Sequence, residues 1–328
     1  MISCSITRGL SLQTRRYASV SSSGSASFSP KTTGSYQVFD RQAKRMQRDR
    51  AALRDDGNAS RTVDYVREEI AHRMLDRLED IKRKFSTILD LGSGSGHFTR
   101  LLDPETTNAS IMLDSSSEWA YLILRKRPHV SYGGETLYRD PDSAFGVKVE
   151  RIQADEENLL QNVGRESQEA IVSCLSLHWM NDLPGVLVQV KEALKPDGLF
   201  LGAMLGGETL FELRTALQLA EVDREGGISP HISPMTDSRD VSNLLGRAGL
   251  TLLTVDVDEI KVNYPSMWEL VDDLKNMGES NAIIGRRHFI HRDTLAAASA
   301  IYKELHGNED GTVPATFQVV FMVNVNSS

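Results

Sequence analysis

The chain has 328 residues and 40% hydrophobic content, enough for one large α/β domain with additions or for two small domains. Its net charge of −8 argues against a general nucleic-acid binder, and no apolar run approaches the ~20 residues needed to cross a bilayer. Cys4 and Cys174 are the only cysteines, which excludes a disulfide framework and a cysteine-based zinc site and fits a reducing compartment.

The N-terminal segment is basic and free of acidic residues. The first 39 residues contain no Asp or Glu, but they contain Arg8, Arg15, Arg16 and Lys31 and many serines. This composition is typical of a mitochondrial transit peptide, and Arg15 to Ser19 resembles a matrix-peptidase cleavage site. We therefore predict a disordered transit peptide over residues 1–35. A disordered tail with no targeting role is the alternative.

Residues 36–84 carry two helical patterns. Residues 39–54 are strongly charged with sparse apolar positions, which predicts a surface helix or arm. Its basic side chains could face an acidic partner, an anionic membrane or only solvent. Between Val63 and Ile81, apolar residues recur every three or four positions, as in an amphipathic helix that packs against a sheet.

Residues 86–102 give the strongest signal in the chain. An apolar run predicts a buried parallel strand that ends at Gly92, and apolar positions from Phe98 onward then take helical spacing. The glycines at 92, 94 and 96 allow positive φ and close approach of a ligand to the backbone. Their G-x-G-x-G spacing differs from the G-x-G-x-x-G of dinucleotide sites, so another nucleotide-like cofactor is favoured. A glycine turn with no ligand is the alternative.

Acidic residues follow the next two predicted strands. Asp114 and Ser115 follow the strand 109–113, and Asp155 and Glu156 follow the strand 147–152. Carboxyl ends of parallel strands line the ligand crevice of such sheets, although Asp155 would also serve as a helix N-cap. Between these strands we expect a helix near 118–126 and, from its glycines and proline, a surface insertion at 131–146.

The loop after the fourth predicted strand, 170–174, is polar and aromatic. Cys174 at the end of this apolar strand suits a buried structural thiol. The loop brings His178 and Trp179, with Asn181 and Asp182, to the crevice. His178 and Trp179 are therefore the candidates for the reactive face, or they simply cap the core.

The remaining pattern completes an alternating α/β chain. A helical face at 187–194, a turn at 195–198 and an irregular loop at 226–234 accompany strands at 199–204, 250–257 and 315–325 and helical elements at 208–248 and 266–306. His288, His291 and Asp293 read H-x-x-H-x-D, which would suit non-haem iron. Asp293 also suits the N-cap of the helix that follows, and we assign no metal site.

The segment D-L-G-S-G-S-G at residues 90–96 resembles motif I of the class I S-adenosyl-L-methionine (SAM) methyltransferases, and L-K-P-D-G at 194–198 is frequent in the same superfamily. The resemblance implies a doubly wound, Rossmann-like α/β domain over 85–328. It also implies that Asp90 and the glycines hold the methionine end of SAM, Asp114 the ribose and Asp155 the adenine. The implied cofactor site comprises Asp90, Gly92, Ser93, Gly94, Gly96, Asp114, Ser115, Asp155 and Glu156.

Longer segments resemble one particular family within this superfamily. FDRQAKRMQRDRA, LSLHWMNDLPG, REGGISPHISPM and LKNMGESNA closely resemble the mitochondrial complex I assembly factor 5 family, and LKNMGESN is also similar to the malonyl-carrier-protein methyltransferases of biotin synthesis. The family implies a matrix protein, peripheral to the inner membrane, that acts in assembly of NADH:ubiquinone oxidoreductase (complex I). It also implies hydroxylation of an arginine in an iron–sulfur subunit.

Two further functions stay open. One is SAM-dependent methyl transfer to a protein or acyl-carrier substrate, in which His178 could act as the base. The other is a non-catalytic assembly chaperone that keeps the SAM fold. Hydroxylation would require oxygen activated by a metal or an organic cofactor. The resemblance carries over no catalytic residue.

Overall fold

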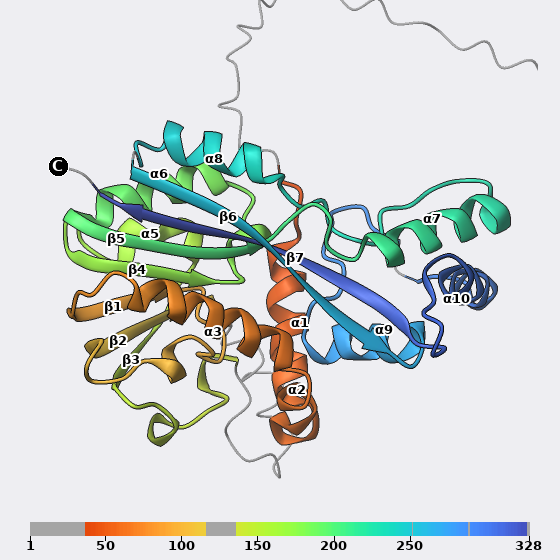
Figure 1. The fold of residues 1–328 in the computed structure, drawn as a ribbon, viewed down its shortest axis with the longest axis horizontal. Helices are drawn as coiled ribbons and strands as arrows, with labels where there is room; N and C mark the ends of the chain where they lie inside the picture. The colour runs from red at the N-terminus through yellow and green to blue at the C-terminus, as the bar shows by residue number, and fades with distance from the viewer. Residues whose placement is uncertain (1–36, 116–135, 251, 288, 327–328) are drawn as a thin grey trace, which may run out of the picture. The chain divides into compact units, whose positions relative to one another are not determined.

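A computed structural model describes residues 37–115, 136–250, 252–287 and 289–326, all within the unit Ser35–Ser328. Its centre is a seven-stranded sheet of order β3-β2-β1-β4-β5-β7-β6 (Figure 1). The strands are β1 (Phe85–Leu91), β2 (Thr107–Asp114), β3 (Lys148–Gln153), β4 (Gln168–Cys174), β5 (Leu194–Leu205), β6 (Leu252–Tyr264) and β7 (Val313–Val325). β1 to β5 pair in parallel, whereas β7 runs antiparallel to both β5 and β6. The predicted doubly wound sheet is confirmed.

β1 and β4 are neighbours near the middle of the sheet. From β1 the chain adds β2 and β3 toward one edge, and from β4 it adds β5 toward the other, so the strand order reverses between β1 and β4. Ligands of doubly wound sheets bind at this reversal, beyond the carboxyl ends of the strands. Leu89 in β1 and Ile171 in β4 are paired and fully buried, as strands covered on both faces require. The predicted apolar runs therefore form the centre of the sheet and aim their carboxyl ends at one crevice.

Helices cover both faces of the sheet. The helices are α1 (Arg41–Leu53), α2 (Asn58–Arg61), α3 (Tyr65–Glu79), α5 (Leu159–Asn162), α6 (Leu183–Ala193), α7 (Phe211–Glu225), α8 (Ser238–Arg247), α9 (Met267–Asn276) and α10 (Arg292–His306). α3 contacts β4 and β5 through a buried stripe that includes Ile70, Met74 and Leu78, so the predicted amphipathic helix is confirmed. α6 and α8 pack on the other face.

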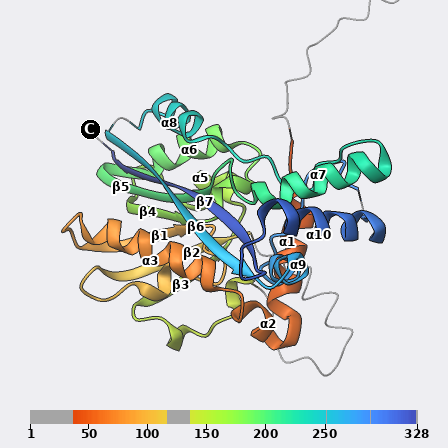
Figure 2. The ribbon, with the colours of Figure 1, turned by 45° about the vertical axis from the view of Figure 1, so that its right-hand side comes forward.

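The C-terminal helices gather at one end of the β6–β7 pair. Figures 1 and 2 both show α7, α9 and α10 there, and α7 and α10 lie against each other. Each contributes to the same apolar core as α3, through residues such as Leu213, Leu270 and Ala298. The predicted helical elements at 208–248 and 266–306 are thus confirmed, and three of their four helices wall one cavity described below.

The segment after the glycine turn differs from its prediction. Instead of an α-helix, it forms a short 3-10 turn, Thr99–Leu101. Thr99 is fully buried and its hydroxyl donates to Asp90 at 2.7 Å, while Asp103 accepts from the N–H of Thr106 and turns the chain into β2. The helical spacing covers only three apolar residues, and the chain makes a single 3-10 turn there before the turn at Asp103 leads into β2.

The basic arm is not a solvated surface helix, as one interpretation had it. Asp40 caps α1 by accepting from Ala43 N at 2.9 Å, and Lys44, Asp49, Ala51 and Ala52 are buried. Before α1, the backbone pairs with the segment at Ala282 to Ile284. The arm is therefore fixed to the domain, and its basic face points inward. Within the described ranges, no helix is both long and apolar enough to cross a membrane.

The predicted surface insertion at 131–146 is partly internal. Leu137, Arg139 and Asp140 are buried, whereas Tyr138 and the following turn at 141–144 are exposed. Arg139 donates to Asp64 at 2.7 Å, which ties the segment to the start of α3. The predicted transit peptide (1–35), the predicted helix near 118–126 and residues 131–135 lie outside the described residues.

Candidate functional site

The glycine turn after β1 uses its three glycines for two purposes. Gly92, Gly94 and Gly96 have φ of +69°, +57° and +81°, values that other residues rarely adopt. A Cβ at Gly92 would lie 1.9 Å from Ser176 Oγ, and a Cβ at Gly96 would lie 2.7 Å from Met112 Cε. At Gly94, however, the nearest atom would be 4.0 Å away. Gly92 and Gly96 therefore permit close packing, whereas Gly94, alone of the three, has no described atom closer than 4.0 Å to the position that a Cβ would occupy.

The predicted acids lie around this turn. Asp114 Oδ2 accepts from Gly94 N at 2.9 Å, and Glu156 Oε1 accepts from Ser115 N at 3.1 Å. Asp155 caps the short helix that follows by accepting from Glu157 N, so the N-cap interpretation is confirmed. The structure thus brings the implied cofactor residues to the ends of β1, β2 and β3.

A basic residue that the sequence analysis did not single out lies beside the acids that follow β3. Arg41 of α1 forms ion pairs with both Asp155 and Glu156. Glu156 is 1% exposed, so its charge is stabilised chiefly by this pair. An adenine amine that binds Asp155 would have to share this carboxylate with Arg41 or displace it.

Asp90 is buried beneath the turn with one oxygen uncompensated. Its Oδ2 accepts from the Thr99 hydroxyl, but Oδ1 has no hydrogen-bond partner among the described residues. Burial, together with the nearby Asp114, raises the pKa of Asp90 to about 7. Such a carboxyl is suited to a cationic ligand group such as an ammonium. The neighbouring Cys174, predicted as a buried thiol, is half-buried and lines a pocket above the turn; burial and the nearby Asp90 raise its pKa, so the thiol stays protonated.

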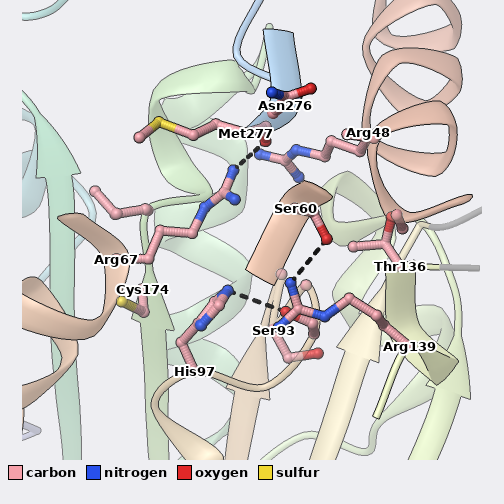
Figure 3. Close-up of a pocket in the computed structure, with 16 residues that line it drawn as sticks. Arg48, Ser60, Arg67, Ser93, His97, Thr136, Arg139, Cys174, Asn276 and Met277 are labelled. Atoms are coloured by element: carbon pink, nitrogen blue, oxygen red, sulfur yellow. Dashed lines mark hydrogen bonds between the residues drawn. The ribbon is translucent and has the colours of Figure 1, made fainter. Parts of the chain in front are cut away.

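A pocket lies above the turn, between the turn and the N-terminal helices (Figure 3). Arg48 from α1 and Arg67 from α3 enter it from one side, and Ser93 and His97 line the other side. Its free space is about 50 Å³, which is room for water but not for an adenosyl amino acid. The polar side chains of the pocket suit a charged ligand. For a ligand as large as an adenosyl amino acid to enter, side chains of α1 would have to move.

A larger cavity of about 560 Å³ adjoins this pocket. The two share Arg67, Leu175 and Met277 as wall residues. The larger cavity has mostly apolar walls from α7, α9 and the start of α10. It has the size of an ordinary small-molecule or side-chain site, and its inner end meets the cofactor pocket.

His178 and Trp179, the predicted reactive pair, both line the larger cavity but differ in their contacts. His178 is 5% exposed, and neither ring nitrogen has a hydrogen-bond partner in the described parts of the chain. Burial, reinforced by the cations of Arg48 and Lys44, lowers the pKa of His178 to about 3. His178 is therefore a neutral imidazole with its hydrogen-bonding capacity unused.

Trp179, in contrast, is committed to holding α1. Its Nε1 donates to Glu279 at 2.9 Å, and Lys44 Nζ lies 3.5 Å from the centre of its ring. Lys44 also donates to Glu279 at 2.6 Å, and burial lowers the pKa of Lys44 to about 7. Burial alone would raise the pKa of Glu279, but Lys44, Arg48 and Arg67 hold it well below its usual range. This network is an anchor for the arm.

The structure does not support a metal site at the residues whose pattern would suit non-haem iron. His291 and Asp293 are exposed, His288 lies outside the described residues, and the N-cap of α10 is His291, so the predicted Asp293 cap is wrong. Among the described residues, Asp64, Glu68 and His97 come close enough to hold an ion. However, Arg139 donates to Asp64, and burial with Arg67 and Arg139 lowers the pKa of His97 well below its usual range. A cationic environment of this kind disfavours a metal ion.

Comparison with known proteins identifies the family. A methyltransferase-domain family matches residues 63–255. The zebrafish (Danio rerio) protein named arginine-hydroxylase NDUFAF5, mitochondrial, is 46% identical over 286 residues, which cover 87% of this chain and 82% of that protein. The human (Homo sapiens) protein of the same name is 44% identical over 309 residues, 94% of this chain and 82% of that protein. The chain belongs to the NDUFAF5 arginine-hydroxylase family.

The family assignment confirms the resemblance found in the sequence. It places the protein in the mitochondrion, because these NDUFAF5 relatives are named as mitochondrial. The more distant resemblance is confirmed as well: a malonyl-[acyl-carrier protein] O-methyltransferase of Gallionella capsiferriformans is 30% identical over 285 residues, 87% of this chain and 90% of that protein. With the observed strand order, the domain match confirms a class I SAM-methyltransferase fold.

Sequence reasoning missed Arg41, Lys44 and Arg48. They lie three and four positions apart, which places them on one helix face, and this spacing was the available signal. It was masked by the many other charges of the arm, so the face that points inward could not be distinguished from the face that points to solvent.

Proposed function

We propose that the protein binds SAM above the turn after β1 and hydroxylates an arginine of an iron–sulfur subunit during complex I assembly. The family name supports an arginine substrate. The observation that carries the proposal is the pair of adjoining cavities, which meet at Arg67, Leu175 and Met277. A ligand in the first cavity would lie against a side chain inserted into the second.

The carboxylates around the glycine turn, which borders the first cavity, fit SAM. Asp114 lies beside Gly94 for the ribose, and Asp155 follows β3 for the adenine. The uncompensated Oδ1 of Asp90 is matched to positive charge at the amino-acid end. When bound, SAM would supply a cationic sulfonium and, in the methyl-transfer alternative, the methyl group.

The second cavity suits an arginine side chain. Its apolar walls, such as Leu213 and Leu274, can cover the methylene stem, while a guanidinium needs hydrogen-bond acceptors. Neutral His178 can accept from a guanidinium N–H, whereas a protonated imidazole would repel it. We assign His178 this positioning role. Replacing a C–H bond by C–OH requires dioxygen, two electrons from an external reductant and two protons, with the second oxygen atom leaving as water.

The proposal includes a matrix location, peripheral to the inner membrane. The acid-free N-terminal segment supports import, and the net charge of −8 gives no support to a nucleic-acid partner. Protease protection in purified mitochondria would test the matrix location, and release by alkaline carbonate would test peripheral binding. Protease accessibility in intact mitochondria or retention after carbonate would contradict it.

The proposed reaction is tested by mass spectrometry of the iron–sulfur subunits from cells that lack the protein. Re-expression of the wild type should restore one added oxygen on an arginine, and Gly94→Val should not. Hydroxylation retained by Gly94→Val at wild-type protein level would contradict SAM dependence. An added methyl group would identify a methyltransferase, and normal assembly without any modification would identify a chaperone. A methylated acyl-carrier product in vitro would favour the function of the bacterial relatives.

A further inference from the structure

Arg48 is a cation without adequate partners. Its side chain is 14% exposed, and its nearest carboxylate, that of Glu279, lies 3.9 Å from Nη2. Its buried Nε has no hydrogen-bond partner within the described ranges. Burying a guanidinium without hydrogen bonds costs free energy, so this arrangement favours a ligand that supplies the missing acceptors.

Among the described residues, the one carboxylate within 4.0 Å of the Arg48 guanidinium is already shared. Glu279 accepts from Lys44 at 2.6 Å, from Arg67 at 2.8 Å and from the Trp179 indole at 2.9 Å. Arg67, which faces the same pocket in Figure 3, donates in addition to Met277 O. Positive charge therefore exceeds negative charge at this wall, and the ligand group that fits is an anion.

The opposite wall also offers polar groups. Ser93 is 6% exposed, and its Oγ has no partner among residues that the structure describes. His97, which lines the same wall, is 8% exposed, and its Nδ1 is likewise unpaired there. Between them lies Gly94, the one glycine of the turn with open space around it. An anion seated here would touch both walls.

We propose that Arg48, supported by Arg67, binds the carboxylate at the amino-acid end of the ligand, with Ser93 donating from the opposite wall. The inference rests on the proposed SAM site, and it specifies the orientation of the ligand in that site. The adenosyl group lies toward Asp114 and Asp155, and the carboxylate lies under α1. Because Arg41 and Arg48 belong to the same helix, α1 contacts both ends of the site and closes over a bound ligand.

The test compares two ligands that differ in the carboxylate. S-adenosylhomocysteine carries the whole amino-acid end, whereas 5′-methylthioadenosine lacks it. Titration calorimetry on the full chain should show tighter binding of S-adenosylhomocysteine by the wild type. Arg48→Met should weaken that binding about 10- to 100-fold, the value of charge-assisted hydrogen bonds, and leave 5′-methylthioadenosine unchanged. Arg48→Lys, which keeps the charge, should lie between the two.

The matched control is Arg45→Met on the same helix. Arg45 hydrogen-bonds only to Arg41 O among the described residues and lines neither cavity, so both affinities should stay at the wild-type value. Thermal unfolding of each variant shows whether it is folded. The inference is overturned if folded Arg48→Met binds S-adenosylhomocysteine like the wild type, or loses both ligands equally. If the wild type binds neither ligand, the proposed SAM site itself is wrong.

Discussion

Alanine at Gly94 should impair ligand binding much more than stability. Gly94 has φ of +57°, and a non-glycine residue there costs about 1–2 kcal/mol of folding free energy. The described residues add no steric cost, because the nearest of their atoms to the new Cβ is Thr136 Cγ2 at 4.0 Å. That Cβ would instead enter the cofactor pocket, where it would meet the ligand. An overpacked contact of about 1–3 kcal/mol corresponds to a loss of affinity of about 5- to 150-fold.

Alanine at Gly92 is the matched comparison, two residues away. With φ of +69°, the free-energy cost of its backbone conformation is similar. Its Cβ, however, would lie 1.9 Å from Ser176 Oγ and 2.3 Å from Ser176 Cβ. Overpacking adds about 1–3 kcal/mol, so the total loss of stability should be about 2–5 kcal/mol. The double variant Gly92→Ala with Ser176→Gly should recover much of the steric part.

Two measurements decide this prediction. Urea unfolding gives the free energy of unfolding of each variant, and titration with S-adenosylhomocysteine gives its affinity. We expect Gly94→Ala to lose about 1–2 kcal/mol of stability and to be strongly impaired in binding, and Gly92→Ala to be less stable than Gly94→Ala. The reasoning is refuted if Gly94→Ala binds the ligand normally, or if the two variants lose equal stability.

Three further predictions concern the ionisable side chains of Asp90, Arg41 and His178. The folded pKa of Asp90 lies above its unfolded value of 3.8, at about 7, so the wild type should lose stability as pH rises from about 4 to above 7. Asp90→Asn should abolish about 2–3 kcal/mol of the stability difference between pH 5 and pH 8, measured by urea unfolding; an unchanged difference would contradict the assignment. Arg41→Met leaves the buried Glu156 carboxylate without its ion pair and should cost about 3 kcal/mol in the same assay, whereas no loss would show that the pair is unimportant. The folded pKa of His178 lies below its unfolded value, at about 3, so the wild type loses stability as pH falls below about 6.5, and His178→Phe should lessen that loss. The same variant should abolish arginine hydroxylation in cells while S-adenosylhomocysteine affinity stays within about twofold; retained hydroxylation would remove the positioning role.

The sheet could be predicted because its signals are local. Buried parallel strands appear as short apolar runs, and the glycine turn and the acids after β2 and β3 mark their carboxyl ends. The glycines predicted a turn but not their different roles. That Gly92 packs on Ser176 while Gly94 remains open depends on the loop after β4, more than 80 residues away along the chain.

The helix of the arm was predicted, but its packing against the domain could not be, because its partners are remote in sequence. Arg41 is separated from Asp155 by 114 residues, and Lys44 is separated from Glu279 by 235 residues. Neither separation leaves a periodic signal, and the composition of the arm is that of a solvated helix. The same applies to the insertion at 131–146, whose Arg139 is buried against Asp64. In each case tertiary ion pairs decided the outcome over local pattern.

The central claim is that the turn after β1 holds an adenosyl amino acid. Native mass spectrometry of the purified full chain tests it most directly, with SAM or S-adenosylhomocysteine added in excess. We predict a one-to-one adduct with the mass of the added ligand in the wild type and its loss in Gly94→Val. An absence of adduct in the wild type, or an equal adduct in folded Gly94→Val, would contradict the account.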